Sequence, residues 1–221
     1  MSKLRYRYQT IELGDHDIHF RALRDRQQYE DDLGEAELIG ISSASWPIAG
    51  LVWPSEEVLA QLMATYELKK KRILEVGCGI GLASLVLNER QADITATDIH
   101  PSSGDNLQHN TQLNNGRHIP FLRTSWEDTP DKQFGMFDLI IGSDLLYEAP
   151  HAKQLAMFIQ QTAKPKCEVL LVDANRGHCP KFRFRMQELG FNFIQLDSIL
   201  PVTAAEKYKG RIFRFRRNFS R

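Results

Sequence analysis

Residues 72–82 read Arg-Ile-Leu-Glu-Val-Gly-Cys-Gly-Ile-Gly-Leu, an apolar run that ends in three glycines at alternate positions. Such a run is typical of a buried parallel strand that delivers its carboxyl end to a tight turn. Glycines at Gly77, Gly79 and Gly81 allow positive φ angles and a closer approach to a ligand than a Cβ would permit. Residues 82–90 then predict a helix whose first N–H groups point at that ligand. The stretch therefore predicts a nucleotide-binding strand, turn and helix.

The spacing of these glycines separates the turn from two other nucleotide-binding loops. The dinucleotide fingerprint needs its third glycine one place later, where Leu82 stands, and a P-loop ends in a Gly-Lys-Ser/Thr sequence that the turn lacks. Glu75 precedes the glycines, and its carboxylate would repel a phosphate but suits a ligand that carries an ammonium or sulfonium charge. An NAD-dependent oxidoreductase is therefore the less favoured enzyme class.

Composition excludes several classes of partner. The chain has 221 residues, 42% of them hydrophobic, and its 28 basic and 28 acidic side chains cancel. Without a global field, neither nucleic acid nor a membrane surface is an expected partner. The apolar runs are shorter than the roughly 20 residues that span a bilayer, so we expect no membrane-embedded segment.

The cysteines and histidines indicate a reduced setting without a metal. Cys78, Cys167 and Cys179 are an odd number without a CxxC pair, and no basic-then-apolar leader opens the chain. We therefore expect a cytoplasmic protein with free thiols. The seven histidines show no metal-ligand spacing with cysteines or acids, so no metal site is predicted.

Strand and helix signals alternate after the glycine turn. The expected strands are residues 72–76, 94–98, 119–122, 137–142, 168–172, 191–196 and 211–216, and the expected helices are residues 82–90, 106–114, 152–163 and 182–189. This order predicts an α/β fold with a Rossmann-like, doubly wound, seven-stranded sheet that is mostly parallel and closes in a C-terminal antiparallel hairpin. The proline at position 120 predicts that the third strand lies at a sheet edge.

The first third of the chain carries different signals. Charged and apolar residues alternate on both sides of a Gly14-Asp15 turn, which predicts an N-terminal β-hairpin extension. Residues 25–37 are mostly charged and predict a mobile connection. Two Trp-Pro pairs within residues 41–54 predict an ordered loop, and Ser55 is expected to cap the helix that follows it.

Polar or aromatic residues follow successive strands of the predicted sheet. Asp98 closes the second strand, Trp126 follows the third, and Ser143 and Asp144 follow the fourth. Ligands of such sheets lie at the carboxyl ends of the strands. Asp98 is well placed to accept both hydroxyls of a ribose, and the Trp126 indole offers a face or an N–H group to an adenine. The structural alternatives are a helix cap for Asp98 and a half-buried surface aromatic for Trp126.

Several motifs occur in an order that resembles the seven-strand protein-lysine methyltransferases, which use S-adenosylmethionine (SAM). Residues 75–82 are similar to the Glu-x-Gly-x-Gly-x-Gly-Leu loop of that group, and residues 144–147 to its Asp-x-x-Tyr element. Trp53 with the following proline resembles its Trp-Pro element, and Asn110 with Asn114 resembles its paired asparagines. The resemblance covers residues 52–147.

The resemblance implies a SAM-dependent methyltransferase that acts on a nitrogen of a protein side chain, with lysine as the first candidate. A protein substrate, a monomeric state and no metal are expected. Residues 1–221 then form one methyltransferase domain, with a hairpin and lid-like loop in residues 1–54 and the SAM-binding core in residues 55–221. Arginine, histidine or a small molecule as acceptor, and a catalytically idle SAM-fold binding module, stay open as alternatives.

The expected roles of individual residues follow from this resemblance and from the chemistry of methyl transfer. Asp144 would hold the hydrogens of the acceptor amine and Tyr147 would form a wall of its channel. The alternative for Asp144 is a cap on the next helix. The residues expected to bind the cofactor are Trp53, Glu75, Gly77, Gly79, Gly81, Asp98, Trp126 and Ser143.

The C-terminal segment is rich in arginine. Arg211, Arg214, Arg216, Arg217 and Arg221 form a basic tail, for which a solvated sheet edge is favoured over binding to RNA.

Overall fold

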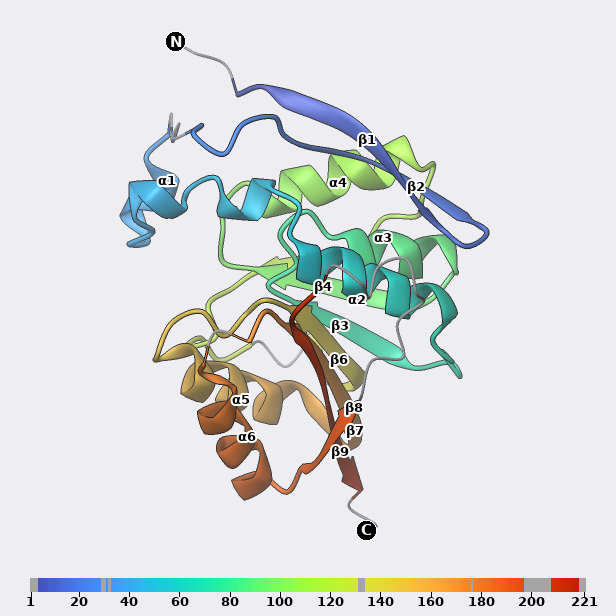
Figure 1. Ribbon diagram of the computed structural model, residues 1–221, viewed down its shortest axis with the longest axis vertical. Coiled ribbons are helices and arrows are strands. Elements are labelled where there is room, and N and C mark those ends of the chain that lie inside the picture. Colours follow the sequence, from blue (N-terminus) through green and yellow to red (C-terminus); the bar gives the residue numbers. More distant parts are fainter. Residues whose placement is uncertain are drawn as a thin grey trace.

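A seven-stranded sheet forms the centre of the computed structural model, which describes residues 4–28, 31, 33–130, 134–175, 177–196 and 208–218. The strands lie in the order β5-β4-β3-β6-β7-β9-β8 (Figure 1). They are β3 (Arg72–Val76), β4 (Asp93–Asp98), β5 (Phe121–Arg123), β6 (Phe137–Ser143), β7 (Ala163–Asp173), β8 (Asn192–Leu196) and β9 (Arg211–Asn218). The neighbouring pairs β5–β4, β4–β3, β3–β6 and β6–β7 are parallel, and β9 runs antiparallel to both β7 and β8. The predicted sheet, its edge strand β5 and its closing hairpin are confirmed.

The chain enters this sheet at its middle. From β3 it moves outward to β4 and β5, and it then returns across β3 to form β6 and β7. Crossovers therefore leave in opposite directions from the carboxyl ends of β3 and β6. This reversal is the topological switch at which open α/β sheets bind their ligands.

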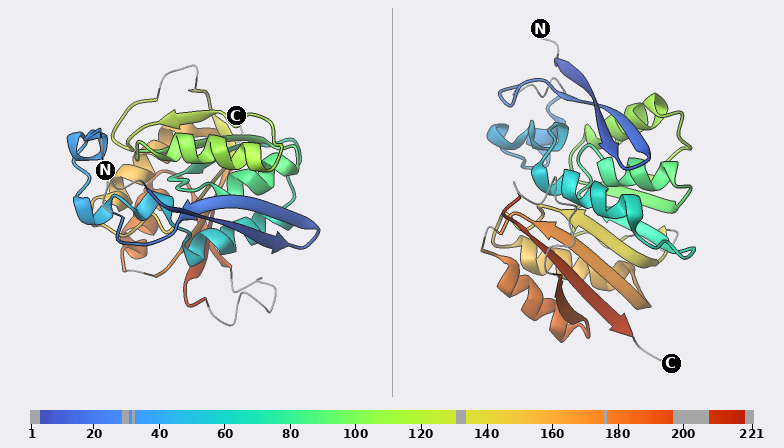
Figure 2. Two further views of the ribbon diagram at one scale, coloured as in Figure 1. Left: turned by 90° about the horizontal axis from the view of Figure 1, so that it is seen from above. Right: turned by 45° about the vertical axis from the view of Figure 1, so that its right-hand side comes forward.

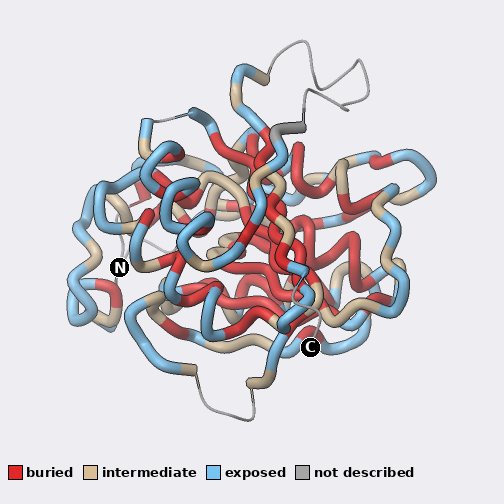
Figure 3. The backbone as a smooth tube through the Cα atoms, turned by 90° about the horizontal axis from the view of Figure 1, so that it is seen from below, coloured by how far each residue is buried: buried red, intermediate tan, exposed pale blue. Residues whose placement is uncertain are grey.

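Alternate residues of the central strands face two separate cores. Ile73 of β3 and Leu170 of β7 belong to one hydrophobic cluster, whereas Leu74 and Val169 belong to the other. The first cluster contains residues of α2 (Pro54–Thr65), α3 (Leu82–Glu89) and α4 (Ser103–Leu113), and the second contains residues of α5 (His151–Thr162) and α6 (Cys179–Glu188). Buried backbone accordingly runs through the middle of the molecule, with exposed segments around it (Figure 3). The continuous apolar runs in the sequence reflect this burial on both faces.

The predicted N-terminal hairpin is confirmed. Strands β1 (Tyr6–Leu13) and β2 (His16–Leu23) pair antiparallel, and Leu13 faces His16 across a two-residue turn that has Gly14 at φ 66°. The hairpin forms a separate two-stranded sheet that lies alongside α4, above the edge of the core (Figures 1 and 2). Ile18 and Phe20 of β2 are buried in the first cluster, so the hairpin shares the core of the domain.

Two asparagines, one within α4 and one at its C-cap, attach this hairpin to the core. The Asn110 side chain accepts a hydrogen bond from the Arg21 amide at 2.9 Å and donates one to the Arg21 carbonyl at 3.4 Å. Asn114 repeats the arrangement with the amide and carbonyl of His19, at 2.8 and 2.6 Å. Four residues of a helix rise about 6 Å, close to the roughly 6.6 Å between alternate residues of a strand, so the two amides act as a substitute for a neighbouring strand.

Three expectations need correction, those for residues 25–37, for Ser55 and for the third strand. The predicted mobile connection of residues 25–37 overlaps the short helix α1 (Glu35–Leu38), whereas the predicted ordered loop of residues 41–54 contains two 3₁₀ turns, η1 (Ser43–Ser45) and η2 (Ile48–Gly50). Ser55 does not cap α2, because Trp53 occupies the N-cap position, Pro54 begins the helix, and the Ser55 hydroxyl lies 2.9 Å from the Tyr208 hydroxyl. Strand β5 begins at Phe121, after the proline that the sequence placed inside it.

Three arginines of β9 make ion pairs or hydrogen bonds within the protein. Arg214 and Arg216 pair with Glu168 at 2.6 and 3.3 Å. Arg217 is only 3% exposed and donates hydrogen bonds to the carbonyls of Ala163 and Lys164. The expectation of a solvated basic edge is therefore wrong for Arg214 and Arg217, whereas Arg211 is exposed and Arg221 lies outside the described residues.

Asn110 is the buried one of the two asparagines that attach the hairpin, and replacing it should weaken the attachment of β2 to α4. Asn110→Ala leaves the Arg21 amide and carbonyl without their partner, so we expect a loss of about 1 to 3 kcal/mol in the free energy of unfolding. Hydrogen exchange of residues 16–23 should accelerate. Gln112→Ala, an exposed position on the same helix, is the control. Equal exchange of the hairpin in both variants would contradict a clamping role for Asn110.

Candidate active site

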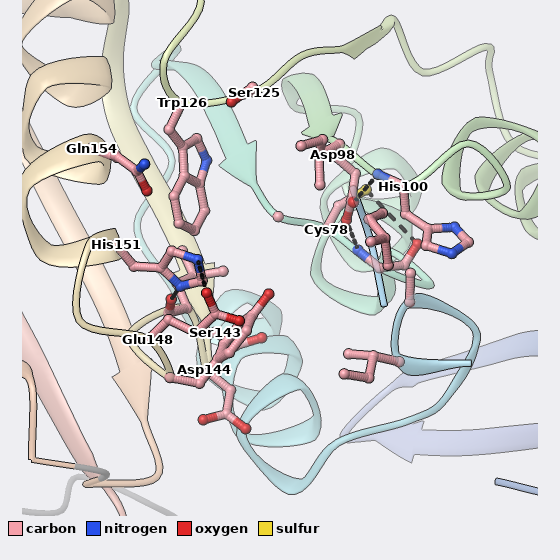
Figure 4. Close-up of a pocket in the computed structure, with 18 of the residues that line it drawn as sticks. Cys78, Asp98, His100, Ser125, Trp126, Ser143, Asp144, Glu148, His151 and Gln154 are labelled. Atoms are coloured by element: carbon pink, nitrogen blue, oxygen red, sulfur yellow. Dashed lines mark hydrogen bonds and ion pairs between the residues drawn. The ribbon is translucent and has the colours of Figure 1, made fainter. Parts of the chain in front are cut away.

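A cavity of about 460 Å³ lies at the topological switch of the sheet (Figure 4). Its walls come from the ends of β3, β4 and β6, the loop after β5, the first turns of α2 and α5, and residues 41–53. Among the residues that line it are Trp53, Gly77, Gly79, Asp98, Trp126, Ser143, Asp144 and Tyr147. The structure thus brings together most of the site residues that the sequence indicated. Glu75 and Gly81 are the two that do not line the cavity.

The glycine turn between β3 and α3 depends on the absence of side chains. Gly77, Gly79 and Gly81 have φ angles of 59°, 55° and 84°. A Cβ at Gly77 would lie 2.6 Å from Leu145 Cδ2, and one at Gly81 would lie 2.5 Å from Leu107 Cδ1. Both the backbone conformation and the packing therefore require glycine at these two positions.

Asp98 connects the glycine turn to β4. One carboxylate oxygen accepts a hydrogen bond from the Gly79 amide and the other from the His100 amide, each at 2.8 Å. The side chain is only 8% exposed, and burial raises its pKa. These two bonds hold a carboxylate at the cavity wall, close to the point where β3 and β4 end. Asp98 and His100 lie across the cavity from Trp126 and His151 (Figure 4).

Glu75 has a different position from the one that its place before the glycines suggested. Its carboxylate is 1% exposed and accepts hydrogen bonds from the Ser84 amide at 2.9 Å and from the Ser84 hydroxyl. Burial raises its pKa to about 7. Glu75 therefore holds the first turn of α3 and does not lie on the cavity surface.

Glu56, which the sequence analysis did not single out, lines the cavity instead. It lies in the first turn of α2, is 3% exposed, and accepts a hydrogen bond from the Leu82 amide at 3.2 Å. Burial and the nearby Glu75 carboxylate raise its pKa to about 8. The available signal was a charge three residues before Leu59, on the buried face of the helix.

His151 is a second cavity residue that the sequence analysis missed. Its ring meets Trp126 edge to face at 5.2 Å and Tyr147 at 4.5 Å between centroids. Nδ1 lies 3.0 Å from the Leu145 carbonyl, so this nitrogen carries the proton when the ring is neutral. The histidine fixes the two aromatic walls relative to each other. No spacing along the chain indicated this role, because the contacts depend on how β6 and α5 are joined.

Asp144 directly follows β6 and has a left-handed backbone conformation. Its φ angle is 53°, and its amide donates to the Val172 carbonyl at 2.8 Å. The next helix, α5, has Pro150 at its N-cap. The alternative in which Asp144 caps that helix is therefore not what the structure shows.

Trp53 lines the cavity from the end of residues 41–53, which are the lid-like loop. Its Nε1–H group donates to the Ile48 carbonyl at 3.0 Å, and the Arg26 guanidinium lies 5.6 Å from the ring centroid. The indole is thus held within its own loop while it lines the cavity.

Sheet order and cavity position together define a Rossmann-like α/β protein with a ligand site at its topological switch point. Residues 34–189 match the lysine methyltransferase family. Protein-lysine methyltransferase METTL21E of Bos taurus is 33% identical over 146 residues, which cover 61% of this chain and 50% of that protein. The calmodulin-lysine N-methyltransferase of Arabidopsis thaliana is 29% identical over 163 residues, which cover 67% of this chain and 54% of that protein.

A solved structure shares the fold. Magnesium protoporphyrin IX methyltransferase of Synechocystis PCC 6803, with bound SAM, aligns with a TM-score of 0.58 and 19% identity over 89% of this chain and 99% of its own. The chain belongs to the lysine methyltransferase family. It spans about half the length of the curated relatives that it matches.

Two kinds of feature are absent from the described residues. No helix there is long and apolar enough to cross a membrane. In the same part of the chain, no group of three or more histidine, cysteine or acidic side chains could hold a metal ion.

The buried acids make stability depend on pH in a predictable direction. Glu56 and Glu75 have pKa values of about 8 and about 7, both raised from 4.5 in an unfolded chain. The folded state holds these protons more tightly than the unfolded chain does. The contribution of these groups to the free energy of unfolding therefore falls as the pH rises from about 4.5 to about 8. From about pH 5.5 to about pH 8.5 the parent chain should therefore lose free energy of unfolding that Glu56→Gln retains. The difference in free energy of unfolding, variant minus parent, should rise by about 1.4 kcal/mol or more over this range.

Urea unfolding at both pH values measures this difference. Glu57→Gln changes the exposed neighbour of Glu56 on the same helix and should show a much smaller effect. A parallel pH dependence in the parent chain and Glu56→Gln would contradict the assignment.

Proposed function

We propose that this chain transfers the methyl group of SAM to a lysine side chain of a protein. The observation that carries the proposal is the cavity at the switch point, which Asp98, Trp126, Asp144 and Tyr147 all line. Membership of the lysine methyltransferase family supports the reaction class, and the names of the two relatives support a protein substrate.

The charge of the cavity fits SAM as the methyl donor. Glu56 and Asp98 line it, and burial raises the pKa of both carboxyl groups. SAM carries a sulfonium and an ammonium group, and a cationic ligand favours buried carboxylates in their charged form. Gly77 and Gly79 add two positions without a Cβ atom to the cavity wall at the end of β3. Both features suit a positively charged nucleoside.

The proposed roles of the cofactor residues follow their places around the cavity. Asp98 accepts hydrogen bonds from the ribose hydroxyls, and Trp126 contacts the adenine. Trp53 covers the ligand from the lid-like loop, and Ser143 with the glycines forms the adjoining wall. When bound, SAM supplies an electrophilic methyl group on its sulfonium.

Asp144 and Tyr147 are proposed to hold the acceptor. A lysine amine enters charged, with an ordinary pKa of about 10.4, and becomes nucleophilic only after it loses a proton. Asp144, Glu127 and Glu148 all line the cavity and would attract the ammonium group. Asp144 then orients the amine hydrogens, and the Tyr147 ring, edge to face with His151, forms one wall of the channel.

The remaining proposals concern the whole chain. We treat residues 1–221 as one domain, with residues 1–54 as hairpin and lid and residues 55–221 as the SAM-binding core. The shared hydrophobic cluster of hairpin and core supports this division into parts of one unit. A monomeric state is proposed, to be checked by light scattering.

Methyl-labelled SAM tests the reaction directly. The chain is incubated with the labelled cofactor and a lysate of its source organism, and mass spectrometry identifies the labelled residue. Label on lysine supports the proposal. Label on arginine, histidine or a small molecule selects one of the other acceptors, and SAM binding without any transfer selects an idle binding module.

Loss of the Asp98 carboxylate should weaken cofactor binding. Asp98→Ala removes the proposed acceptor of the ribose hydroxyls, so the binding free energy of SAM should fall by about 1.5 to 3 kcal/mol. Titration calorimetry measures the change, and Asp93→Ala at the exposed start of β4 is the control. Unchanged affinity in Asp98→Ala, or preferential binding of NAD, would contradict the assignment.

The Asp144 side chain can be changed with little disturbance of the backbone. Asparagine tolerates the φ of 53° at this position, so Asp144→Asn should keep the fold and the SAM affinity of the parent. Turnover on the true substrate should fall by roughly 10²-fold or more, because the oriented charge is lost. Glu148→Gln, at another acid that lines the cavity, should reduce turnover much less. A parental rate in folded Asp144→Asn would exclude the catalytic role.

A further inference from the structure

Glu56 is a buried acid for which the proposed mechanism has no role so far. It lies on α2, is 3% exposed, and yet lines the cavity. No salt bridge within the described part of the chain includes Glu56. Burying a carboxylate without a cation is costly. The single hydrogen bond from the Leu82 amide does not supply the missing cation.

The position of Glu56 relates it to one end of the proposed ligand. Its Oε1 accepts from Leu82, the first residue of α3, whereas the Asp98 carboxylate is bonded to Gly79. Trp53 of the lid-like loop precedes Glu56 by three residues and lines the same cavity. If Asp98 holds the ribose, the part of the cavity between the lid and the start of α3 is left for the amino-acid end of the cofactor.

We infer that Glu56 accepts a hydrogen bond from the α-ammonium group at the methionine end of SAM. The inference rests on the proposed function and names the residue that recognises the amino acid of the cofactor. The positive charge of an ammonium group stabilises a buried carboxylate in its ionised form, and a charge-assisted hydrogen bond is stronger than a neutral one. Glu56 would thereby distinguish SAM and its product from adenosine ligands that lack the amino acid.

Proton release should accompany binding. With a pKa of about 8, Glu56 is mostly protonated near pH 7 before the ligand binds. The ammonium favours the carboxylate, so the Glu56 proton leaves to solvent as the ion pair forms. Affinity should therefore rise with pH up to about 8. The other titratable groups near this wall are Glu75, Cys78, Asp98 and His100.

Two ligands separate recognition of the amino acid from support of the fold. S-adenosylhomocysteine carries the α-amino group, and 5′-methylthioadenosine keeps the adenosine and the thioether but has no amino acid. Calorimetry at about pH 8.5 compares them on the parent chain, Glu56→Gln and Glu57→Gln. We expect Glu56→Gln to weaken S-adenosylhomocysteine roughly tenfold and to leave 5′-methylthioadenosine unchanged. Glu57→Gln should match the parent chain with both ligands.

A measurement on the parent chain alone avoids dependence on how the variant folds. Near pH 7, titrations in two buffers with different heats of ionisation should show proton release for S-adenosylhomocysteine and much less for 5′-methylthioadenosine. Equal weakening of both ligands in Glu56→Gln, or equal proton release for both, would overturn the inference and leave Glu56 as a support for α3. If the parent chain binds neither S-adenosylhomocysteine nor SAM, the proposed function itself fails.

Discussion

The tight turn from Gly77 to Gly81 is the constraint on which the rest of the site depends. It ends β3 and starts α3 within a few residues, and each glycine adopts a positive φ angle. The Gly79 amide binds Asp98 at the end of β4, and the missing Cβ at Gly77 leaves room for Leu145 after β6. Three strand ends are therefore positioned by one turn. A side chain in it would displace the neighbouring walls as well as strain the backbone.

The same region concentrates three buried carboxylates. Glu56, Glu75 and Asp98 are all at most 8% exposed, and burial raises the pKa of each. Their acceptor oxygens are used to hold backbone amides at the turn and at the start of α3. Glu56 and Asp98 line the cavity, so a cationic ligand there can offset the desolvation cost of these two carboxylates. This cost is intelligible as part of a binding site and difficult to explain as part of a core.

The sheet could be predicted because its determinants are local. Continuous apolar runs marked buried strands, and the glycines marked the turn, so Asp98, Trp126 and Asp144 could be assigned to strand ends. Residues that reach the site from helices escaped notice, as Glu56 and His151 show, because their orientation depends on helix rotation and on how distant elements pack. Glu75 was placed on the cavity surface, yet its carboxylate turns to Ser84. Arg217 was expected to be solvated, yet it donates hydrogen bonds to two carbonyls at the start of β7, a contact that depends on how distant segments pair.

The lid-like loop is defined by fixed points on either side of it. Before the loop, Asn110 and Asn114 hold β2 against α4, and after it Trp53 leads into α2. Between them, the Ala49 carbonyl comes within 3.5 Å of the position that a Gly79 Cβ would occupy. The loop therefore packs directly over the glycine turn, and a shift of either flank would be transmitted to the cavity. Through this coupling, residues 41–53 determine the shape of one side of the cavity.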